Sequence, residues 1–446
     1  MSLAPEPGHA PRFAYRVLHR IIEVKPAEVP ALGYAWLYIL AVLSSYYILR
    51  PIRDQAGIAG GVNNLQWLFL GTLIGMLALN VPYGWLVRTL PRSRFIPLTY
   101  RFFSLNMLLF AAALHWSGPD ATIWVGRIFF VWTSVFNLFV VSVFWAMIVD
   151  IFDSEQGKRL FGFIAAGATA GAIIGSALTA SLAEHVSALW LLIGAALLLE
   201  GAVFCVRRLS RLSTALNQRP DPGRTDRAVG GGVLSGITHA LKSPYLLNVS
   251  LFLLLFAITS TFLYFEQAAI VSRTLHGRGA QTAFFASVDL AVNVLTLAVQ
   301  LFLTGRIVRR LGLAVALALL PGFSILGFGA LAAMPTLTAV VPFQVLRRAG
   351  NFAIARPLRE VLFTVLPRED RYKAKSFIDT VVYRLGDQVG AWSFALLGFL
   401  GWGSRSALVA IPLSAAWLAN ALWLGRRQDA MARQEEGSHG PSTEKR

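Results

Sequence analysis

Residues 31–54 read ALGYAWLYILAVLSSYYILRPIRD, an apolar run that ends in two arginines and an aspartate. From Ala31 to Leu49 it holds about 19 residues, and at about 1.5 Å per residue a helix of that length crosses a lipid bilayer. The run therefore predicts a transmembrane helix. Similar runs follow along the rest of the chain.

Arg50, Arg53 and Asp54 are unusual neighbours for such a run. A charge at the centre of a membrane helix costs roughly 2.5–3.5 kcal/mol on insertion scales, so charged side chains there face a protein interior or a wet cavity. One interpretation is that these residues line a transport route. The alternative is that the two arginines close the helix and extend to the lipid headgroups.

The composition predicts a polytopic membrane protein. Of 446 residues, 56% are hydrophobic and 14% are charged, whereas soluble domains are about one quarter charged. The mean hydropathy is +0.59. The fold class expected is all-α, with about twelve transmembrane helices in two six-helix halves. The apolar stretches cover roughly residues 31–53, 65–88, 95–116, 121–152, 160–182, 188–206, 243–271, 281–307, 312–334, 338–366, 374–400 and 407–424.

The chain is expected to divide at residues 207–242, a basic stretch with prolines and a glycine run. It predicts a cytoplasmic linker between an N-terminal half at 31–206 and a C-terminal half at 243–425. Residues 1–30 alternate apolar and basic side chains at helical spacing, which predicts an amphipathic cytoplasmic segment on the membrane surface. Residues 426–446 are polar, and we expect a disordered cytoplasmic tail.

The formal net charge is +17, which in a soluble protein would suggest nucleic acid as a partner. Here the basic residues concentrate in alternate loops, near residues 12–25, 88–94, 158–159, 207–242, 306–310 and 368–375. The opposite loops hold little beyond Arg273, Arg278 and Arg405. This asymmetry predicts both termini in the cytoplasm, in a bacterial inner membrane, with the lipid bilayer and not nucleic acid as the partner.

No motif of the sequence supports an enzyme. Cys205 is the only cysteine, so no intramolecular disulfide can form, and no two histidines have the spacing of metal ligands. The H-E-x-x-H, G-x-S-x-G and Walker A patterns are all missing from the sequence. We therefore expect no catalytic residue, no metal and no cofactor.

The two halves look like a duplication. Residues 84–90 and 305–311 share the pattern G-x-[LI]-V-R-x-L, and a similar offset relates other residues in the same order. The corresponding residues are Arg127 and Arg348, Gly171 and Gly386, and Gly175 and Gly390. The loop that begins with glycine and continues with basic residues resembles the loop signature of the major facilitator superfamily.

Three segments resemble the ATP/ADP antiporter family more closely: ILRPIRD at 48–54, FW at 144–145 with SEQGKRLF at 154–161, and YKAKSFID at 372–379. Its nucleotide carriers use a Lys on helix 1, acids on helices 4 and 7, and a Lys on helix 11. Arg53 keeps the first charge and Glu266 the third. Residues 133–137 hold no acid, and Asp387 stands where the second Lys is expected.

In the superfamily, helices 1, 4, 10 and 11 line the central cavity. The resemblance therefore implies a substrate site on five arginines of these helices: Arg50, Arg53, Arg127, Arg348 and Arg384. A guanidinium group presents a planar fork of donors that suits phosphate or carboxylate. Gating or coupling is expected from Asp54, Glu266 and Asp387, with Arg53 and Glu266 as an outer gate and Arg127 as a counterpart to Asp387.

The main hypothesis is an alternating-access transporter of a small organic anion, either a nucleotide in ATP/ADP-type exchange or another phosphorylated metabolite. The alternative is proton-coupled symport or export, in which Glu266, Asp387 or Asp289 takes up the proton. A further alternative is a membrane scaffold or sensor that transports nothing. The oligomeric state stays open, and a monomer is compatible with the sequence.

Overall fold

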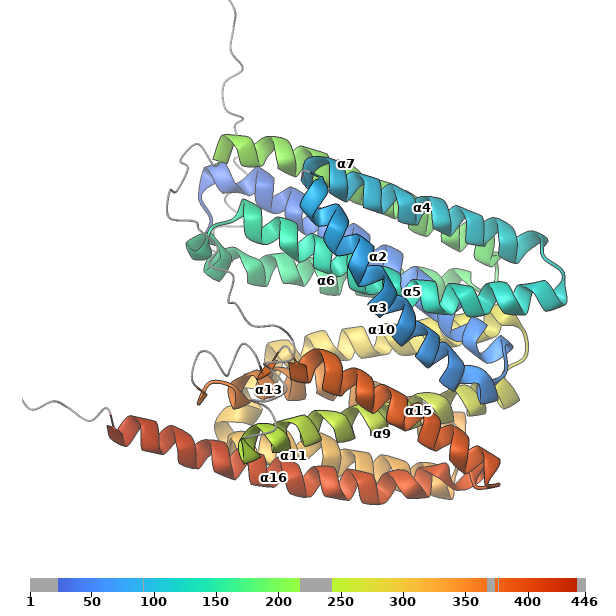
Figure 1. Ribbon diagram of the computed structural model, residues 1–446, viewed down its shortest axis with the longest axis vertical. Coiled ribbons are helices and arrows are strands. Elements are labelled where there is room, and N and C mark those ends of the chain that lie inside the picture. Colours follow the sequence, from blue (N-terminus) through green and yellow to red (C-terminus); the bar gives the residue numbers. More distant parts are fainter. Residues whose placement is uncertain (1–22, 91, 217–242, 367–373, 376, 439–446) are drawn as a thin grey trace, which may run out of the picture. The chain divides into compact units, whose positions relative to one another are not determined.

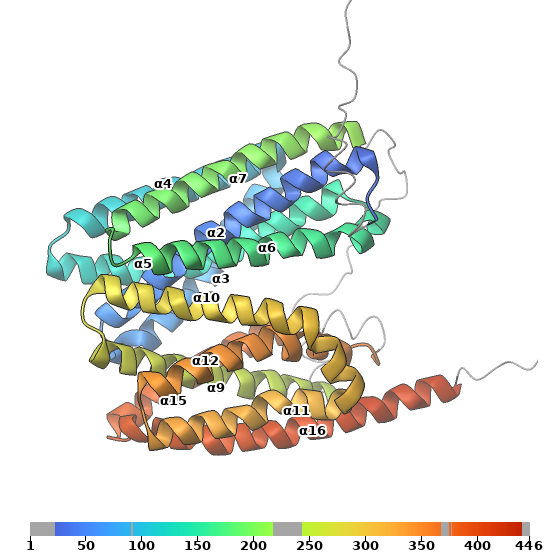
Figure 2. The same cartoon turned by 180° about the vertical axis from the view of Figure 1, so that it is seen from behind.

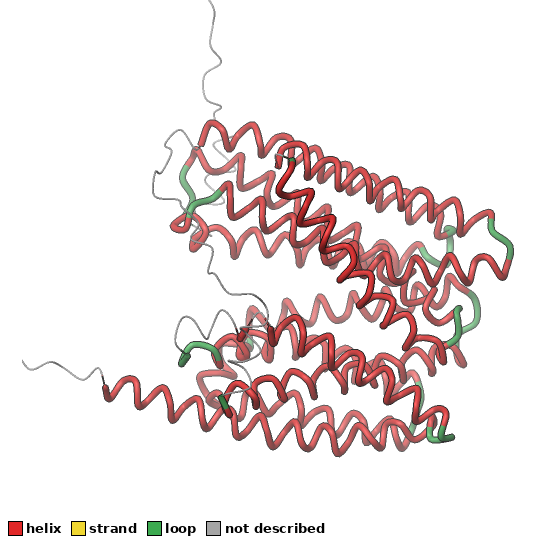
Figure 3. Tube along the Cα trace, in the orientation of Figure 1, coloured by secondary structure: helices red, strands yellow, loops and turns green. Residues whose placement is uncertain are grey.

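The structure is a computed structural model that describes residues 23–438 except 91, 217–242, 367–373 and 376. The described residues form helices and no strands (Figure 3). Ten of the described helices are long and apolar enough to cross a membrane. The predicted all-α polytopic fold is therefore confirmed.

The helices before the 217–242 gap correspond to the first half expected from the sequence. They are α2 (Val29–Ala59), α3 (Leu65–Thr89), α4 (Arg92–Trp116), α5 (Pro119–Ile151), α6 (Ser154–Leu182) and α7 (Ala188–Leu216), with short 3₁₀ turns η1 (Pro26–Glu28) and η2 (Val62–Asn64). Pro119 starts α5. Proline lacks a backbone N–H, but at the first helical position this N–H would have no acceptor within the helix. Asp153 caps α6 by accepting a 2.7 Å hydrogen bond from the backbone N of Gln156.

After the gap, two of the expected helices are interrupted. The continuous helices are α9 (Pro244–Thr274), α10 (Arg278–Phe302), α11 (Thr304–Ala333) and α16 (Ser406–Ser438). The apolar stretch at 338–366 consists of α12 (Leu337–Gly350), the π-helical turn η3 (Asn351–Ala355) and α13 (Arg356–Leu362). The stretch at 374–400 contains a second π-helical turn, η4 (Ile378–Val382), and then α15 (Tyr383–Phe399), while η5 (Gly403–Arg405) precedes α16. Because α12 has 14 residues and α15 has 17, neither crosses a membrane as a regular helix alone.

The chain forms two compact units (Figures 1 and 2). The first contains the described residues of Met1–Gly57, Ile74–Thr225 and Gly277–Leu290. The second contains those of Ile58–Leu73, Asp226–His276 and Ala291–Arg446. The start of α3 thus belongs to the second unit and the start of α10 to the first, although the sequence places them in the opposite halves.

Several helices continue past the ends expected from hydropathy. Helix α2 reaches Ala59, so Arg50, Arg53 and Asp54 do not close it, and Pro51 lies inside it. Helix α7 continues to Leu216, so the expected linker begins as helix. Helix α16 reaches Ser438, so the expectation of disorder from residue 426 is wrong as far as that residue. Ala, Met, Gln, Glu and Arg are good helix formers, and leaving the membrane does not end a helix. Residues 1–22, 217–242 and 439–446 lie outside the described part.

Candidate functional site

Arg50 pairs with an aspartate of α10. Its Nη1 lies 3.4 Å from Oδ1 of Asp289, whose side chain is almost fully buried. Residues 277–290 belong to the same unit as α2, so the pair lies within one compact body. The Nε of Arg50 is buried and has no acceptor among the described residues. Arg50 therefore has a counter-ion, and its Nε–H remains able to donate a hydrogen bond.

Arg53, one turn further along α2, is held differently. Its Nη1 lies 3.7 Å from Oδ1 of the buried Asp54, and its guanidinium carbon lies 4.1 Å from the centre of the Phe130 ring on α5. A cation over an aromatic face is stabilised by the ring's quadrupole. The Nε of Arg53 is also buried without an acceptor in the described chain.

Arg127 lies on α5, one turn before Phe130. Helix α5 packs against α2 at this level, because a Cβ added to Gly126 would lie 3.2 Å from the Cβ of Ala56. Arg127 is half-buried and turns its guanidinium carbon to 4.5 Å from the Trp124 ring. With Asp54 and Asp289, the three arginines leave an excess of positive charge where α2 meets α5 and α10.

A cavity of about 250 Å³ lies beside the same stretch of α2. Its lining includes Ile52, Gln55 and Ala56, together with Arg278 at the start of α10. At 100° per residue Ile52 and Gln55 lie on the other side of α2 from the two arginines, whereas Ala56 lies one turn after Arg53 on the same side. The lining contains none of Arg50, Arg53 and Arg127, so we do not join the cavity and the arginines into one site.

The other candidate residues lie in the second unit. Arg384 Nη1 is 3.2 Å from Oδ2 of Asp387, one turn along α15. Glu266 of α9 is buried and accepts a hydrogen bond from the Ser406 hydroxyl of α16. Arg348 of α12 is half-buried. The two pairings expected from the sequence, Arg53 with Glu266 and Arg127 with Asp387, stay predictions.

Arg347 is the residue that sequence reasoning passed over in favour of Arg348. Its guanidinium is buried and donates to Ser324 Oγ at 3.0 Å, Ser260 Oγ at 2.8 Å and Thr259 Oγ1 at 2.7 Å. Within the described residues the group contacts only neutral atoms and the Phe256 and Trp417 rings. Arg347 therefore ties α12 to α9, α11 and α16. The signal in the sequence that could have indicated a buried partner for Arg347 is the presence of hydroxyl residues within the apolar helices α9 and α11.

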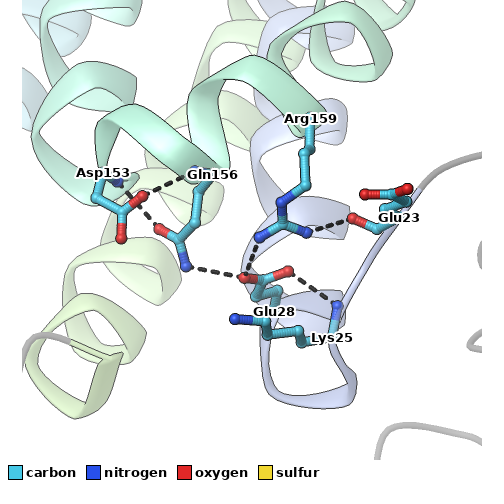
Figure 4. Close-up of polar contacts among 6 residues, drawn as sticks. All are labelled: Glu23, Lys25, Glu28, Asp153, Gln156 and Arg159. Atoms are coloured by element: carbon cyan, nitrogen blue, oxygen red, sulfur yellow. Dashed lines mark hydrogen bonds and ion pairs between the residues drawn. The ribbon is translucent and has the colours of Figure 1, made fainter.

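The SEQGKRLF segment, one of those that resemble the antiporter family, forms a polar network at the start of α6 (Figure 4). The buried Glu28 carboxylate accepts hydrogen bonds from Gln156 Nε2 at 2.9 Å, Arg159 Nη2 at 3.1 Å and the backbone N of Lys25 at 2.9 Å. Arg159 also donates to the carbonyl oxygen of Glu23. The network joins the first turns of α2 and α6, and we assign it a structural role.

The family model of the Major Facilitator Superfamily matches residues 33–391. The chain belongs to this superfamily. The ADP,ATP carrier protein 1 of Chlamydia trachomatis is 23% identical over 348 residues, which cover 68% of this chain and 65% of that carrier. The resemblance to the ATP/ADP antiporter family is thus confirmed at the level of sequence similarity.

Solved structures of the superfamily share the fold of this chain. A bacterial homologue of the iron transporter ferroportin aligns with a TM-score of 0.61 and 13% identity, over 87% of this chain and 98% of that one. The nucleoside transporter NupG aligns with a TM-score of 0.55 and 12% identity, over 92% and 100%. At these identities the likeness concerns the fold alone. The superfamily member described here is a multi-pass membrane transporter and not an enzyme.

Proposed function

We propose that this protein is an alternating-access secondary transporter of a small organic anion. The observation that carries the proposal is the pair of half-buried arginines Arg50 and Arg53, whose buried Nε donors lack an acceptor among the described residues. A buried donor without a partner is costly, and an anionic ligand would remove that cost. Arg127 adds positive charge on α5, so an anion is favoured over a cation.

A phosphorylated metabolite, such as ATP or ADP, is the substrate class that we favour. Arginine binds the planar oxygen fork of phosphate better than lysine does. The similarity to a carrier named for ADP and ATP supports the same class. Of the four charged positions associated with that family, however, Asp387 reverses one and residues 133–137 lack another. Recognition of the purine ring must therefore be tested separately from recognition of the phosphate.

Exchange is the transport mode that this charge arrangement favours. A binding region with excess positive charge resists reorientation while empty, and a bound anion removes that barrier. The alternating basic loops favour insertion in a bacterial inner membrane with both termini on its cytoplasmic side. Uptake would then depend on a counter-substrate inside the vesicle.

Proteoliposome uptake of labelled ATP and ADP tests both parts of the proposal. We expect uptake into vesicles loaded with unlabelled nucleotide and little uptake into empty vesicles. Equal uptake in both would reject exchange. If neither nucleotide is taken up but another phosphorylated compound is exchanged, the nucleotide is rejected as substrate and the proposal of anion transport stands.

Proton coupling is the second candidate. It rests on Glu266, a buried carboxylate that accepts hydrogen bonds from the hydroxyl of Ser406 and the backbone N–H of Ala407. A carboxylate in such a place can take up and release a proton during a transport cycle. If transport by the wild-type protein does not respond to an imposed pH gradient, this candidate is rejected.

A further inference from the structure

An ion pair joins α4 and α7, which run side by side in the first unit (Figures 1 and 2). Arg101 Nε of α4 is 3.4 Å from Glu200 Oε1 of α7. The pair is not buried, because the Arg101 side chain is 50% exposed and the Glu200 side chain is 42% exposed. Both residues lie inside membrane spans, at Arg94–Trp116 and Ala188–Leu212.

The depth of Glu200 makes this exposure unfavourable. The apolar run of α7 ends at Val206, before Arg207 and Arg208, so Glu200 lies about 9 Å inside its nearer end at 1.5 Å per residue. A glutamate side chain is too short to reach the headgroups from there. Its surroundings are apolar, with exposed Leu98, Phe102 and Leu197 on the same two helices. In a monomer the pair would therefore face lipid hydrocarbon, which charged side chains avoid.

The contact between the two side chains leaves most of their hydrogen-bonding capacity unused. Within the described part of the chain, each of the two side chains makes this one polar contact. It joins Nε of Arg101 to a single carboxylate oxygen of Glu200. The four N–H bonds of the terminal guanidinium nitrogens and the second oxygen of Glu200 still need partners. In hydrocarbon no water supplies them.

The geometry points to a second copy of this chain as the partner on this face. A two-fold axis beside an adjacent positive and negative group brings Arg101 of one copy to the carboxylate of the other, and the reverse. The face is thus complementary to itself. Any other membrane partner would have to supply a base and an acid of its own at the same depth.

Glycines on α7 would allow the copies to approach. Gly201 follows Glu200 and is exposed, and Gly194 lies two turns earlier on the same side of the helix. An added Cβ at either glycine would meet nothing within 4 Å. Small residues on a membrane helix let another backbone come close and let interhelical polar contacts form.

Single-molecule photobleaching in lipid bilayers tests the proposal. The full chain, labelled once at its C-terminal end, is diluted stepwise into lipid, and the fraction of two-step bleaching gives the dimer population. We expect wild-type dimers that dissociate on dilution. The R101L/E200L variant keeps the helices apolar and folded, and we expect its dimer dissociation constant to rise about tenfold or more.

Charge reversals separate contacts between copies from contacts within one copy. R101E and E200R each place like charges on the face, so each variant alone should be monomeric. Mixed together, the two variants are complementary and should form heterodimers. A pair that acted only within one chain would not be restored by mixing.

Thermal unfolding in detergent confirms that each variant is folded. If one reversal does not fold, R101L/E200L and the swapped R101E/E200R variant, which should dimerise, carry the test. The proposal is overturned if the wild type is monomeric at every dilution. It is also overturned if R101L/E200L dimerises like the wild type, or if mixing the two folded reversals yields no heterodimer.

Discussion

At the scale of single residues, Asp289 explains why Arg50 can stay charged inside α2. The two side chains are 3.4 Å apart, and Asp289 is 3% exposed. Removing one partner of a buried pair leaves the other charge uncompensated, at a cost of about 3–5 kcal/mol. Because Arg50 is one-fifth exposed, the lower end of that range applies.

The first prediction is that Asp289→Asn lowers the free energy of unfolding by about 3 kcal/mol. The measurement is thermal unfolding of the purified protein in detergent. The matched control is Glu360→Gln, which breaks the exposed pair with Lys375 and should cost about 1 kcal/mol or less. Equal shifts for both variants would contradict a buried pair at Arg50.

The second prediction concerns Arg53 and rests on the proposed function. Arg53→Lys keeps the charge but loses the planar fork and its Nε donor, so the KM for a phosphorylated solute should rise about tenfold. Uptake kinetics in loaded proteoliposomes measure this. The control is Arg309→Lys at the exposed start of α11, where, within the described residues, the arginine donates to the carbonyl of Gly305 one turn earlier. An unchanged KM for Arg53→Lys would remove Arg53 from the substrate site.

Which charges lie inside the protein could be predicted from the sequence, but their pairing could not. Arg50 and Arg53 stand out because they interrupt an apolar run. The sequence offers Asp289 as a candidate for proton uptake and not as the partner of Arg50, because contact between α2 and α10 depends on packing. Arg347 and Arg348 are adjacent in sequence but point in different directions, and only the structure gives Arg347 its hydroxyl partners.

At the scale of helices, glycine contacts support the predicted duplication. Gly167, Gly171 and Gly175 place α6 against the α2 backbone, where added Cβ atoms would lie 2.9 Å, 2.4 Å and 2.4 Å from the carbonyl oxygens of Trp36, Leu40 and Ser44. The Ser44 hydroxyl also donates to Gly171 O at 3.0 Å.

In the second unit, α15 approaches α9 in the same way. An added Cβ on Gly386 would lie 2.6 Å from the Ala257 Cβ, and one on Gly390 would lie 2.9 Å from the Thr261 Cβ. The glycines that correspond in sequence therefore have the same structural role. Each pair allows close packing against the first transmembrane helix of its half, α2 or α9.

The third prediction is that Gly171→Ala destabilises the protein by about 1–3 kcal/mol, since a Cβ at 2.4 Å from Leu40 O forces the two helices apart. Gly162→Ala on the same helix is the control. Its added Cβ would meet nothing within 4 Å, so the change should be neutral or slightly stabilising. Thermal unfolding in detergent compares them. Equal stability of the two variants would contradict close packing of α6 on α2.

The π-helical turns were the part of the helix pattern that hydropathy could not predict. Mean hydropathy marks 338–366 and 374–400 as two spans, although η3 begins at Asn351 between arginines and η4 contains Asp379. A π turn changes backbone hydrogen bonding and not composition, so it leaves no signal in the apolar pattern. One consequence is visible in the second unit, where Arg359 of α13 lies 3.4 Å from Asp379 of η4.

At the scale of the whole molecule, bilayer thickness explains why the number of helical segments was predictable and their ends were not. A span needs about 20 apolar residues, and this requirement marks each crossing in the sequence. Outside the hydrocarbon no such requirement applies. Helix α16 therefore reaches Ser438 through residues that are polar yet form helices well.

The fourth prediction tests which part of a ligand the whole protein recognises. If phosphate binding at Arg50 and Arg53 provides the affinity, ATP at 100 times its Kd should stabilise the full chain by about 2.7 kcal/mol, whereas adenosine should give no shift. Thermal unfolding in detergent measures both ligands, and the Arg50→Gln/Arg53→Gln variant should lose the ATP shift because the charge-assisted donors are gone. An equal shift with adenosine would move recognition from the phosphate to the ring. A shift that survives in the variant would place the anion away from α2.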